Sequence, residues 1–292
     1  MRSVGDRGFN STERKRVYRP AVDAMRHRLG LLAVVLVALA GCGGDSHPAA
    51  RKRARHTDTA TPAAGRGCAE PGYREATIRF RTRDGVTLSG AIVGSGPVGA
   101  VLIHEYPRDS CGWWPYAGYL SRHGVRALAF DLRCFGQSAC PSGRGHAIDD
   151  VAAAMAELRR RGARRVALVG ASMGGAIAVV AAARLHPAAV VDLSGERDTT
   201  GLTPGIDADA GAAAHGVTAP ALFAVARGDR YVPVPDMRAV ARRVRSSTTR
   251  LIVLPTVAGH GWDLMYGVGT RWSPLAVTVA AFVRRHAGRR RT

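Results

Sequence analysis

Apolar residues of the chain follow two different periods from residue 73 onward. Residues 76–80 alternate with a period of two, residues 83–85 are a turn signal, and residues 86–93 follow as a second strand, so an opening hairpin is predicted. Continuous apolar runs then recur, which is typical of strands buried on both faces of a parallel sheet. These runs cover residues 99–103, 125–130, 166–169, 189–193, 221–226 and 250–254.

Helical patterns separate these runs. They are predicted at about residues 114–122, 148–160, 174–185, 235–244 and 274–286. A hairpin followed by repeated strand–helix units predicts an α/β fold, with a mostly parallel sheet of about eight strands and helices on both faces. We expect one domain over residues 73–287 and a basic tail over 288–292. Residues 194–219 are too short a connection for a large lid domain.

The N-terminal region carries the pattern of an export signal. Residues 29–40 form a twelve-residue apolar stretch, whereas a membrane-spanning helix needs about twenty residues. Basic residues precede this stretch, and Leu-Ala-Gly-Cys at 39–42 follows it, which is the layout of a secretory signal. The tetrapeptide resembles the bacterial lipobox. The resemblance implies that residues 25–41 are a lipoprotein signal peptide and that Cys42 is lipidated, anchoring the protein to the extracytoplasmic face of the membrane.

Two alternatives stay open in this region. The cysteine is either the lipidation site or a chance residue after an ordinary signal peptide. Residues 1–24 are polar and arginine-rich, so they either precede a true start at Met25 or form a cytoplasmic extension. Residues 42–72 are predicted to be the anchor and a flexible tether. The basic run at 51–55 either attracts anionic headgroups or is a solvated linker.

Four cysteines remain once Cys42 is assigned to lipid. An even number outside the cytosol predicts two disulfides, and free thiols are the alternative. Three pairings are open among these cysteines. Cys111, Cys134 and Cys140 fall in loops at the predicted active-site edge, so we expect one bridge to join two of those loops. The four are Cys68, Cys111, Cys134 and Cys140.

The strongest chemical motif is Gly-Ala-Ser-Met-Gly at 170–174, between a buried strand and a helix. Gly170 and Gly174 permit a sharp turn that presents the hydroxyl of Ser172 and leaves the amide of Met173 available to an oxyanion. A serine nucleophile needs a base, and the base needs an acid that orients it. Ligands of such sheets bind beyond the carboxyl ends of the strands.

Two later strands supply these partners. Asp229 follows the run at 221–226, and His260 follows the run at 250–254. The order Ser172, Asp229, His260 resembles the triad of the α/β-hydrolase family. Competing acids are Asp207 and Asp236, and competing histidines are His186 and His215, which lie at less suitable places relative to the strands.

The resemblance extends to the loop His-Glu-Tyr at 104–106. It implies that the amide of Tyr106 completes an oxyanion hole with that of Met173, and that His104 is a structural hydrogen-bonding residue. The loop is similar to the dienelactone-hydrolase branch, whose cysteine nucleophile is absent here, so its lactone substrate is not carried over. Glu105 either touches Ser172 in the resting enzyme or forms an ion pair.

A second resemblance lies in residues 131–138, which match the family's loop after the fourth strand. Cys134 replaces a glycine there, which favours a disulfide at this position. A shallow pocket is expected near residues 195–215 and a set of aromatic residues that are alternatively part of the core. This set is Trp113, Trp114, Tyr116 and Trp262.

These observations predict a membrane-anchored extracytoplasmic serine hydrolase acting on small or short-acyl esters. Alternatives are a peptidase or thioesterase with the same triad, or a non-catalytic lipoprotein binding module. No cofactor or metal is expected, and the protein is expected to be a monomer. The charge is the remaining question: 42 Lys+Arg against 22 Asp+Glu give +20. Predicted export and the lack of a nucleic-acid-binding motif indicate that this positive charge serves attraction to a membrane surface and not binding to nucleic acid.

Overall fold

The structure is a computed structural model that describes residues 68–141, 146–202, 206–267 and 272–288. The expected signal peptide, Cys42, the extension at 1–24 and nearly all of the tether lie outside the described residues. None of the described helices combines the length and the apolar character that a membrane span requires.

Eight strands form one sheet in the order β1-β2-β4-β3-β5-β6-β7-β8. β2 runs antiparallel to both of its neighbours, and all other pairs are parallel. The opening hairpin and the mostly parallel sheet are therefore confirmed. The strands are β1 (Thr77–Arg81), β2 (Thr87–Val93), β3 (Val98–Ile103), β4 (Arg126–Phe130), β5 (Arg165–Ala171), β6 (Ala189–Leu193), β7 (Ala221–Ala226) and β8 (Thr249–Leu254).

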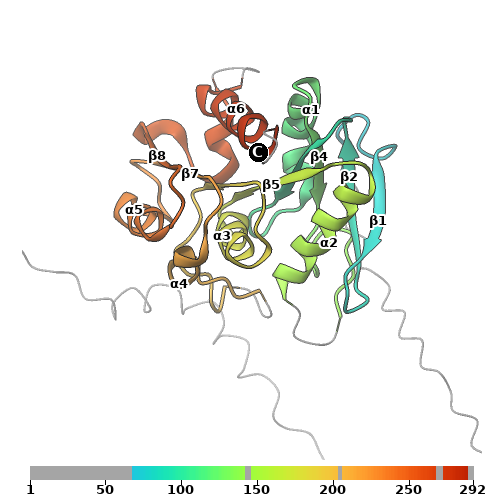
Figure 1. The fold of residues 1–292 in the computed structure, drawn as a ribbon, viewed down its shortest axis with the longest axis horizontal. Coiled ribbons are helices and arrows are strands. Elements are labelled where there is room, and N and C mark those ends of the chain that lie inside the picture. The colour runs from blue at the N-terminus through green and yellow to red at the C-terminus, as the bar shows by residue number, and fades with distance from the viewer. Residues whose placement is uncertain (1–67, 142–145, 203–205, 268–271, 289–292) are drawn as a thin grey trace, which may run out of the picture. The chain divides into compact units, whose positions relative to one another are not determined.

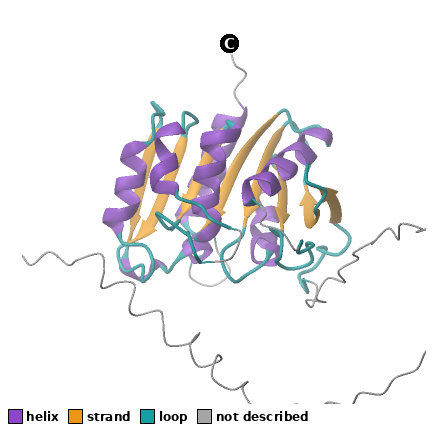
Figure 2. Cartoon of the chain, turned by 90° about the horizontal axis from the view of Figure 1, so that it is seen from below, coloured by secondary structure: helices purple, strands orange, loops and turns teal. Residues whose placement is uncertain are grey.

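Helices cover both faces of this sheet (Figures 1 and 2). One face packs against α1 (Trp114–Arg122) and α6 (Pro274–Gly288), and the other against α2 (Ala147–Arg160), α3 (Met173–Leu185) and α5 (Val234–Arg243). The described part of the connection between β6 and β7 holds only the short helix α4 (Ala210–Ala213) and a 3-10 turn, η4 (Ala214–Gly216).

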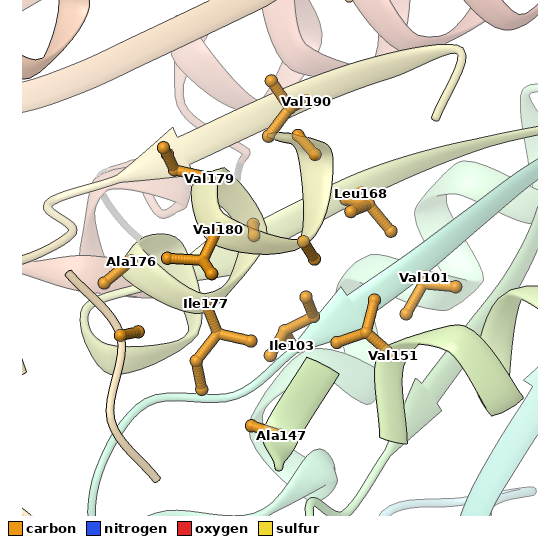
Figure 3. Packing of buried hydrophobic residues seen from close by; sticks show 14 of the residues in the cluster. Val101, Ile103, Ala147, Val151, Leu168, Ala176, Ile177, Val179, Val180 and Val190 are labelled. Atoms are coloured by element: carbon orange, nitrogen blue, oxygen red, sulfur yellow. The ribbon is translucent and has the colours of Figure 1, made fainter. Parts of the chain in front are cut away.

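Burial on both faces explains the continuous apolar runs of the inner strands, whereas the run in β8 lies at the edge of the sheet and is only half-buried. In β3, Val101 and Ile103 belong to the core on the α2 and α3 side, whereas Ala100 and Leu102 belong to the core on the α1 and α6 side. Figure 3 shows Val101 and Ile103 packed with Ile177 of α3. A strand with apolar residues on both sides has no face to expose, so it lies inside the sheet.

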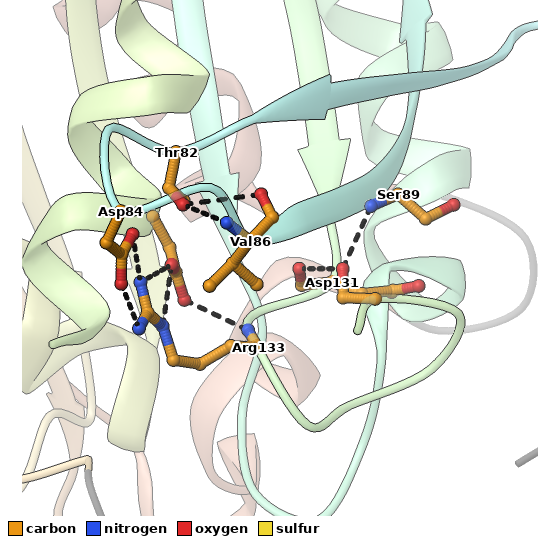
Figure 4. Close-up of polar contacts among 8 residues, drawn as sticks. Thr82, Asp84, Val86, Ser89, Asp131 and Arg133 are labelled. Atoms are coloured by element: carbon orange, nitrogen blue, oxygen red, sulfur yellow. Dashed lines mark hydrogen bonds and ion pairs between the residues drawn. The ribbon is translucent and has the colours of Figure 1, made fainter. Parts of the chain in front are cut away.

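Polar contacts fix the loop after β4. Asp131 accepts hydrogen bonds from the amide and the hydroxyl of Ser110, at 2.8 and 2.6 Å. The guanidinium of Arg133 is buried and pairs with Asp150 at 2.7 Å and with Asp84 at 2.9 Å (Figure 4). Because Asp150 is fully buried and pairs with Arg133, removing Arg133 leaves an uncompensated buried charge, whereas removing Asp150 leaves Arg133 paired with the half-exposed Asp84.

Two disulfides are present, as predicted: Cys68–Cys111 and Cys134–Cys140. The expectation that one bridge joins two loops at the active-site edge is wrong. Cys134 has a φ of 66°, and its amide donates to the carbonyl of Ala139, so the chain doubles back and brings Cys140 to it within one loop. Cys111 instead pairs with the start of the described chain.

The two bridges close loops of very different length. In the chain-entropy account, a bridge over 43 residues stabilises by about 4 kcal/mol and one over 6 residues by about 2 kcal/mol. We expect the Cys68→Ser/Cys111→Ser double variant to lower the free energy of unfolding more than the Cys134→Ser/Cys140→Ser variant. Urea unfolding of both variants measures the difference, and an equal or reversed loss would contradict this ranking.

Candidate active site

A sharp turn between β5 and α3 presents Ser172. Its backbone lies at φ 50° and ψ −123°, a strained conformation for a residue with a side chain. A Cβ atom at Gly170 would lie 2.0 Å from the carbonyl oxygen of Gly174, and one at Gly174 would lie 2.3 Å from that of Ile103. Both glycines are therefore required by close backbone approach, and the turn packs directly on the end of β3.

Asp229 and His260 meet at the same edge of the sheet. Nδ1 of His260 lies 2.9 Å from both carboxylate oxygens of Asp229 and donates its proton to them. The amides of Tyr231 and Val232 also donate to Asp229, each at 2.9 Å. This arrangement fixes the imidazole tautomer and leaves Nε2 unprotonated in the neutral ring.

The competing acid Asp207 accepts a hydrogen bond from the amide of Gly201 instead. Asp236 lies in the first turn of α5 and makes no hydrogen bond to His260 among the contacts of the described residues. Of the three acids considered, the structure brings only Asp229 to His260.

Burial and hydrogen bonding oppose each other in this pair. Burial raises the pKa of Asp229, but the hydrogen bonds from His260 and the two amides outweigh it, so the pKa lies below its usual value. For His260, burial lowers the pKa, and the hydrogen bond and charge of Asp229 raise it above its usual value. An ionised Asp229 therefore stabilises a protonated imidazole.

The hydroxyl of Ser172 has an unexpected partner. It donates to Oε1 of Glu196 at 2.9 Å, and no hydrogen bond among the described residues joins it to His260. The sequence did not single out Glu196. The signal was its place three residues past the carboxyl end of β6, the strand next to β5.

The loop after β3 begins at the backbone that Gly174 approaches closely. His104 is buried, its Nδ1 donates to the carbonyl of Glu105 at 3.0 Å, and its Nε2 accepts from the amide of Leu132 at 3.1 Å. Burial lowers the pKa of His104, so the ring is neutral and serves as a structural hydrogen-bonding residue. It holds the carbonyl that precedes Tyr106.

The two amides expected to bind an oxyanion are placed on neighbouring elements. Met173 is the first residue of α3, so its N–H has no partner inside the helix. The amide of Tyr106 makes no backbone hydrogen bond within the described ranges. Both amides are therefore left without a hydrogen-bond partner among the described residues, as donors to an oxyanion must be.

Glu105 does not touch Ser172 in this structure. Its Oε2 accepts weakly from the amide of Trp262 at 3.4 Å, and no ion pair of the described residues includes it. Burial raises the pKa of Glu105 to about 7. Neither role that the sequence left open for Glu105 is present, and Glu196 makes the contact with Ser172 instead.

Most of the aromatic residues expected to edge a pocket lie in the core. Trp113 is fully buried and donates to the carbonyl of Ile103 at 2.9 Å, and Trp114 donates to that of Pro71 at 2.9 Å. Tyr116 is buried too and donates to Ala276. Trp262 is partly buried, with its ring edge-on to that of Trp113.

Two tyrosines in the loops after β7 and β3 are exposed instead. The ring of Tyr231 lies 4.8 Å from that of His260 and is 63% exposed, and Tyr106 is 44% exposed. Among the described residues, no group of three or more His, Cys, Asp or Glu side chains is arranged to hold a metal ion.

Comparison with known sequences agrees with this geometry. Residues 100–194 match the family model of the serine aminopeptidases, S33. Epoxide hydrolase 3 of Siraitia grosvenorii is 36% identical over 100 residues, which are 32% of this chain and 30% of that protein. The uncharacterized protein YfhR of Escherichia coli K12 is 29% identical over 110 residues, 34% of this chain and 39% of that protein. The chain thus matches about a third of the length of these relatives.

Solved structures resemble a larger share of the chain. The esterase Pf2001 of Pyrococcus furiosus superposes with a TM-score of 0.60 at 18% identity, covering 72% of this chain and 89% of that one. A thermophilic esterase of Thermogutta terrifontis gives 0.58 at 19% identity, covering 72% and 99%. At such identities the likeness shows the fold. The sheet order and these superpositions show that the chain has the α/β-hydrolase fold.

Proposed function

We propose that the protein is a serine hydrolase acting on carboxylic esters through Ser172, His260 and Asp229. The observation that carries this proposal is the strained turn at Ser172, which lies at the same sheet edge as the bonded Asp229–His260 pair. A strained backbone conformation of this kind persists where the surrounding structure imposes it, which is typical of functional sites.

The proposed mechanism uses the unprotonated Nε2 of His260 and the unpaired amides of Tyr106 and Met173. Ser172 turns from Glu196 to His260, and its oxygen attacks the ester carbonyl while Nε2 of His260 takes the proton. Asp229 stabilises the imidazolium, and the amides of Tyr106 and Met173 bind the oxyanion. The alcohol leaves with the proton from His260. Water, deprotonated by the same nitrogen, then attacks the acyl-enzyme and releases the acid.

Ester substrates of small size are favoured by two observations. Solved neighbours are described as esterases, and the short connection between β6 and β7 contains no large covering element in its described part. A second candidate is amide hydrolysis, favoured by the description of the matched family as serine aminopeptidases. Matched ester and amide substrates of one acyl group distinguish the two.

The proposed location is the extracytoplasmic face of the membrane, with lipid on Cys42. The lipobox-like sequence at 39–42 supports it. Two disulfides support export independently, because disulfides persist in oxidising compartments and are rare in the cytosol.

Replacing the proposed nucleophile tests the mechanism directly. We expect Ser172→Ala to lower the hydrolysis of p-nitrophenyl acetate by roughly 10⁴-fold or more and to abolish fluorophosphonate labelling. The control Ser246→Ala removes a hydroxyl from an exposed loop and is expected to keep both signals. Labelling that persists in Ser172→Ala would overturn the proposed nucleophile.

The close packing of the turn against β3 gives a second test. A Cβ at Gly174 meets the carbonyl oxygens of Ile103 and His104 at 2.3 and 2.5 Å, so Gly174→Ala pushes the two proposed oxyanion amides apart. We expect kcat/KM for p-nitrophenyl acetate to fall by about 10²-fold. The control is Gly118→Ala in α1, where the nearest atom is Arg122 Nη1 at 3.6 Å. It should keep activity and raise stability by about 0.5–1 kcal/mol. Equal activities would contradict the role of this contact.

Lipidation is tested in cells that process bacterial lipoproteins. Metabolic labelling with an alkyne fatty acid should mark the full chain, and Cys42→Ala should lose the label and leave the membrane fraction. Ser46→Ala, four residues away, is the matched control and should keep both. An unlabelled wild-type protein in the membrane fraction would contradict the lipid anchor.

A further inference from the structure

Glu196 lies against the reacting atoms without a role in the proposed mechanism. Its Oε1 accepts the proton of the Ser172 hydroxyl at 2.9 Å. Its second oxygen, Oε2, is buried and has no hydrogen-bond partner among the described residues. A buried carboxylate oxygen without a donor costs free energy, so the side chain is incompletely satisfied in the free protein.

Acidic groups dominate the surroundings of Glu196. Asp192 of β6, the strand that precedes Glu196, is buried and accepts a hydrogen bond from the amide of Gly195 at 2.6 Å. Asp229 follows β7 and raises the pKa of Glu196 electrostatically, after the larger effect of burial, whereas His260 and the Ser172 hydroxyl lower it. Glu105 is close enough to His260 to raise the pKa of that imidazole by its charge.

Arginine does not balance these carboxylates. The chain carries a formal charge of +20, yet no ion pair within the described residues includes Glu196, Asp192 or Glu105. The buried carboxylates of the described residues that do pair with arginine are Asp150 and Glu157, both in α2. The positive charge of the chain is therefore not used to neutralise Glu196.

An ionised Glu196 opposes the attack on a neutral ester. The tetrahedral intermediate carries a negative charge beside Ser172, and two like charges at short range in a partly buried site repel strongly. Attack also removes the hydroxyl donor from Oε1. A substrate that brings a positive charge to this place compensates both losses, because an ammonium donates to Oε1 and Oε2 and attracts the oxyanion.

We propose that Glu196 is a specificity-determining residue that selects esters with a protonated amine on the carbon next to the reacting carbonyl, that is, aminoacyl esters. The position of the amine follows from the short distance between Glu196 and the attacking oxygen of Ser172, 2.9 Å. An amine two bonds from the attacked carbonyl carbon is close enough to this oxygen to meet Glu196. This inference rests on the proposed role of Ser172.

A pair of substrates of equal shape tests the selection. Alanine ethyl ester and ethyl isobutyrate differ only in an ammonium that replaces a methyl group. At a pH of about 6.5, below the pKa of an α-amino group, we expect the wild type to favour the alanine ester in kcat/KM. Glu196→Gln should reduce this preference by about 10-fold to 100-fold, the worth of a hydrogen bond to a charged group.

Two further variants separate charge from structure. Glu75→Gln removes the same charge from an exposed position and is expected to keep the preference of the wild type. Glu196→Asp keeps the charge on a shorter side chain and is expected to retain part of the preference. Thermal unfolding confirms that each variant is folded.

Other results would overturn the selection. A wild type that does not favour the alanine ester, or a Glu196→Gln variant with unchanged preference, contradicts it. Equal acceleration of both esters in Glu196→Gln also contradicts it and makes Glu196 a brake on Ser172. Failure of the proposed function is separate: it appears as hydrolysis of ethyl isobutyrate that survives Ser172→Ala.

Discussion

The contact between the turn after β5 and the end of β3 is the constraint on which the rest of the site depends. Gly174 lies so close to the carbonyls of Ile103 and His104 that no side chain fits between them. This contact places the start of α3 beside the loop that carries Tyr106. The order of the sheet makes it possible, because β3 and β5 are neighbours and parallel, so both loops leave from the same edge.

The polar residues around this contact have structural roles and take no part in the proposed reaction. His104 is held neutral by burial and uses both ring nitrogens in structural hydrogen bonds. Asp131 and Arg133 secure the loop after β4, whose amide at Leu132 binds that histidine. The loops after β3 and β4 are thus tied to each other before any substrate arrives. Such connections reduce the reorganisation that catalysis would otherwise require.

Much of this arrangement was predictable from sequence, and the exceptions have physical causes. Long apolar runs and the order of Ser172, Asp229 and His260 mark strands and strand ends, and both follow from local composition. The disulfide pairing was not predictable, because it depends on the left-handed conformation of Cys134. Trp113 is in the core because its indole N–H reaches the carbonyl of Ile103, a contact between elements that sequence does not specify.

Glu196 could not be predicted either, because its contact with Ser172 joins two different loops. Its role depends on where a loop side chain points, which the spacing of motifs does not indicate. The strained turn holds Ser172 where Glu196 accepts its proton, while Glu196 also raises the pKa of His260 by its charge. A positive group that pairs with Glu196 would therefore free the Ser172 hydroxyl and lower the pKa of His260, which increases the unprotonated fraction of the base at neutral pH. Both effects act in the same direction. Binding of a cationic substrate and assembly of the proposed triad are then one coupled event, since the same carboxylate controls the serine proton and the charge on the imidazole.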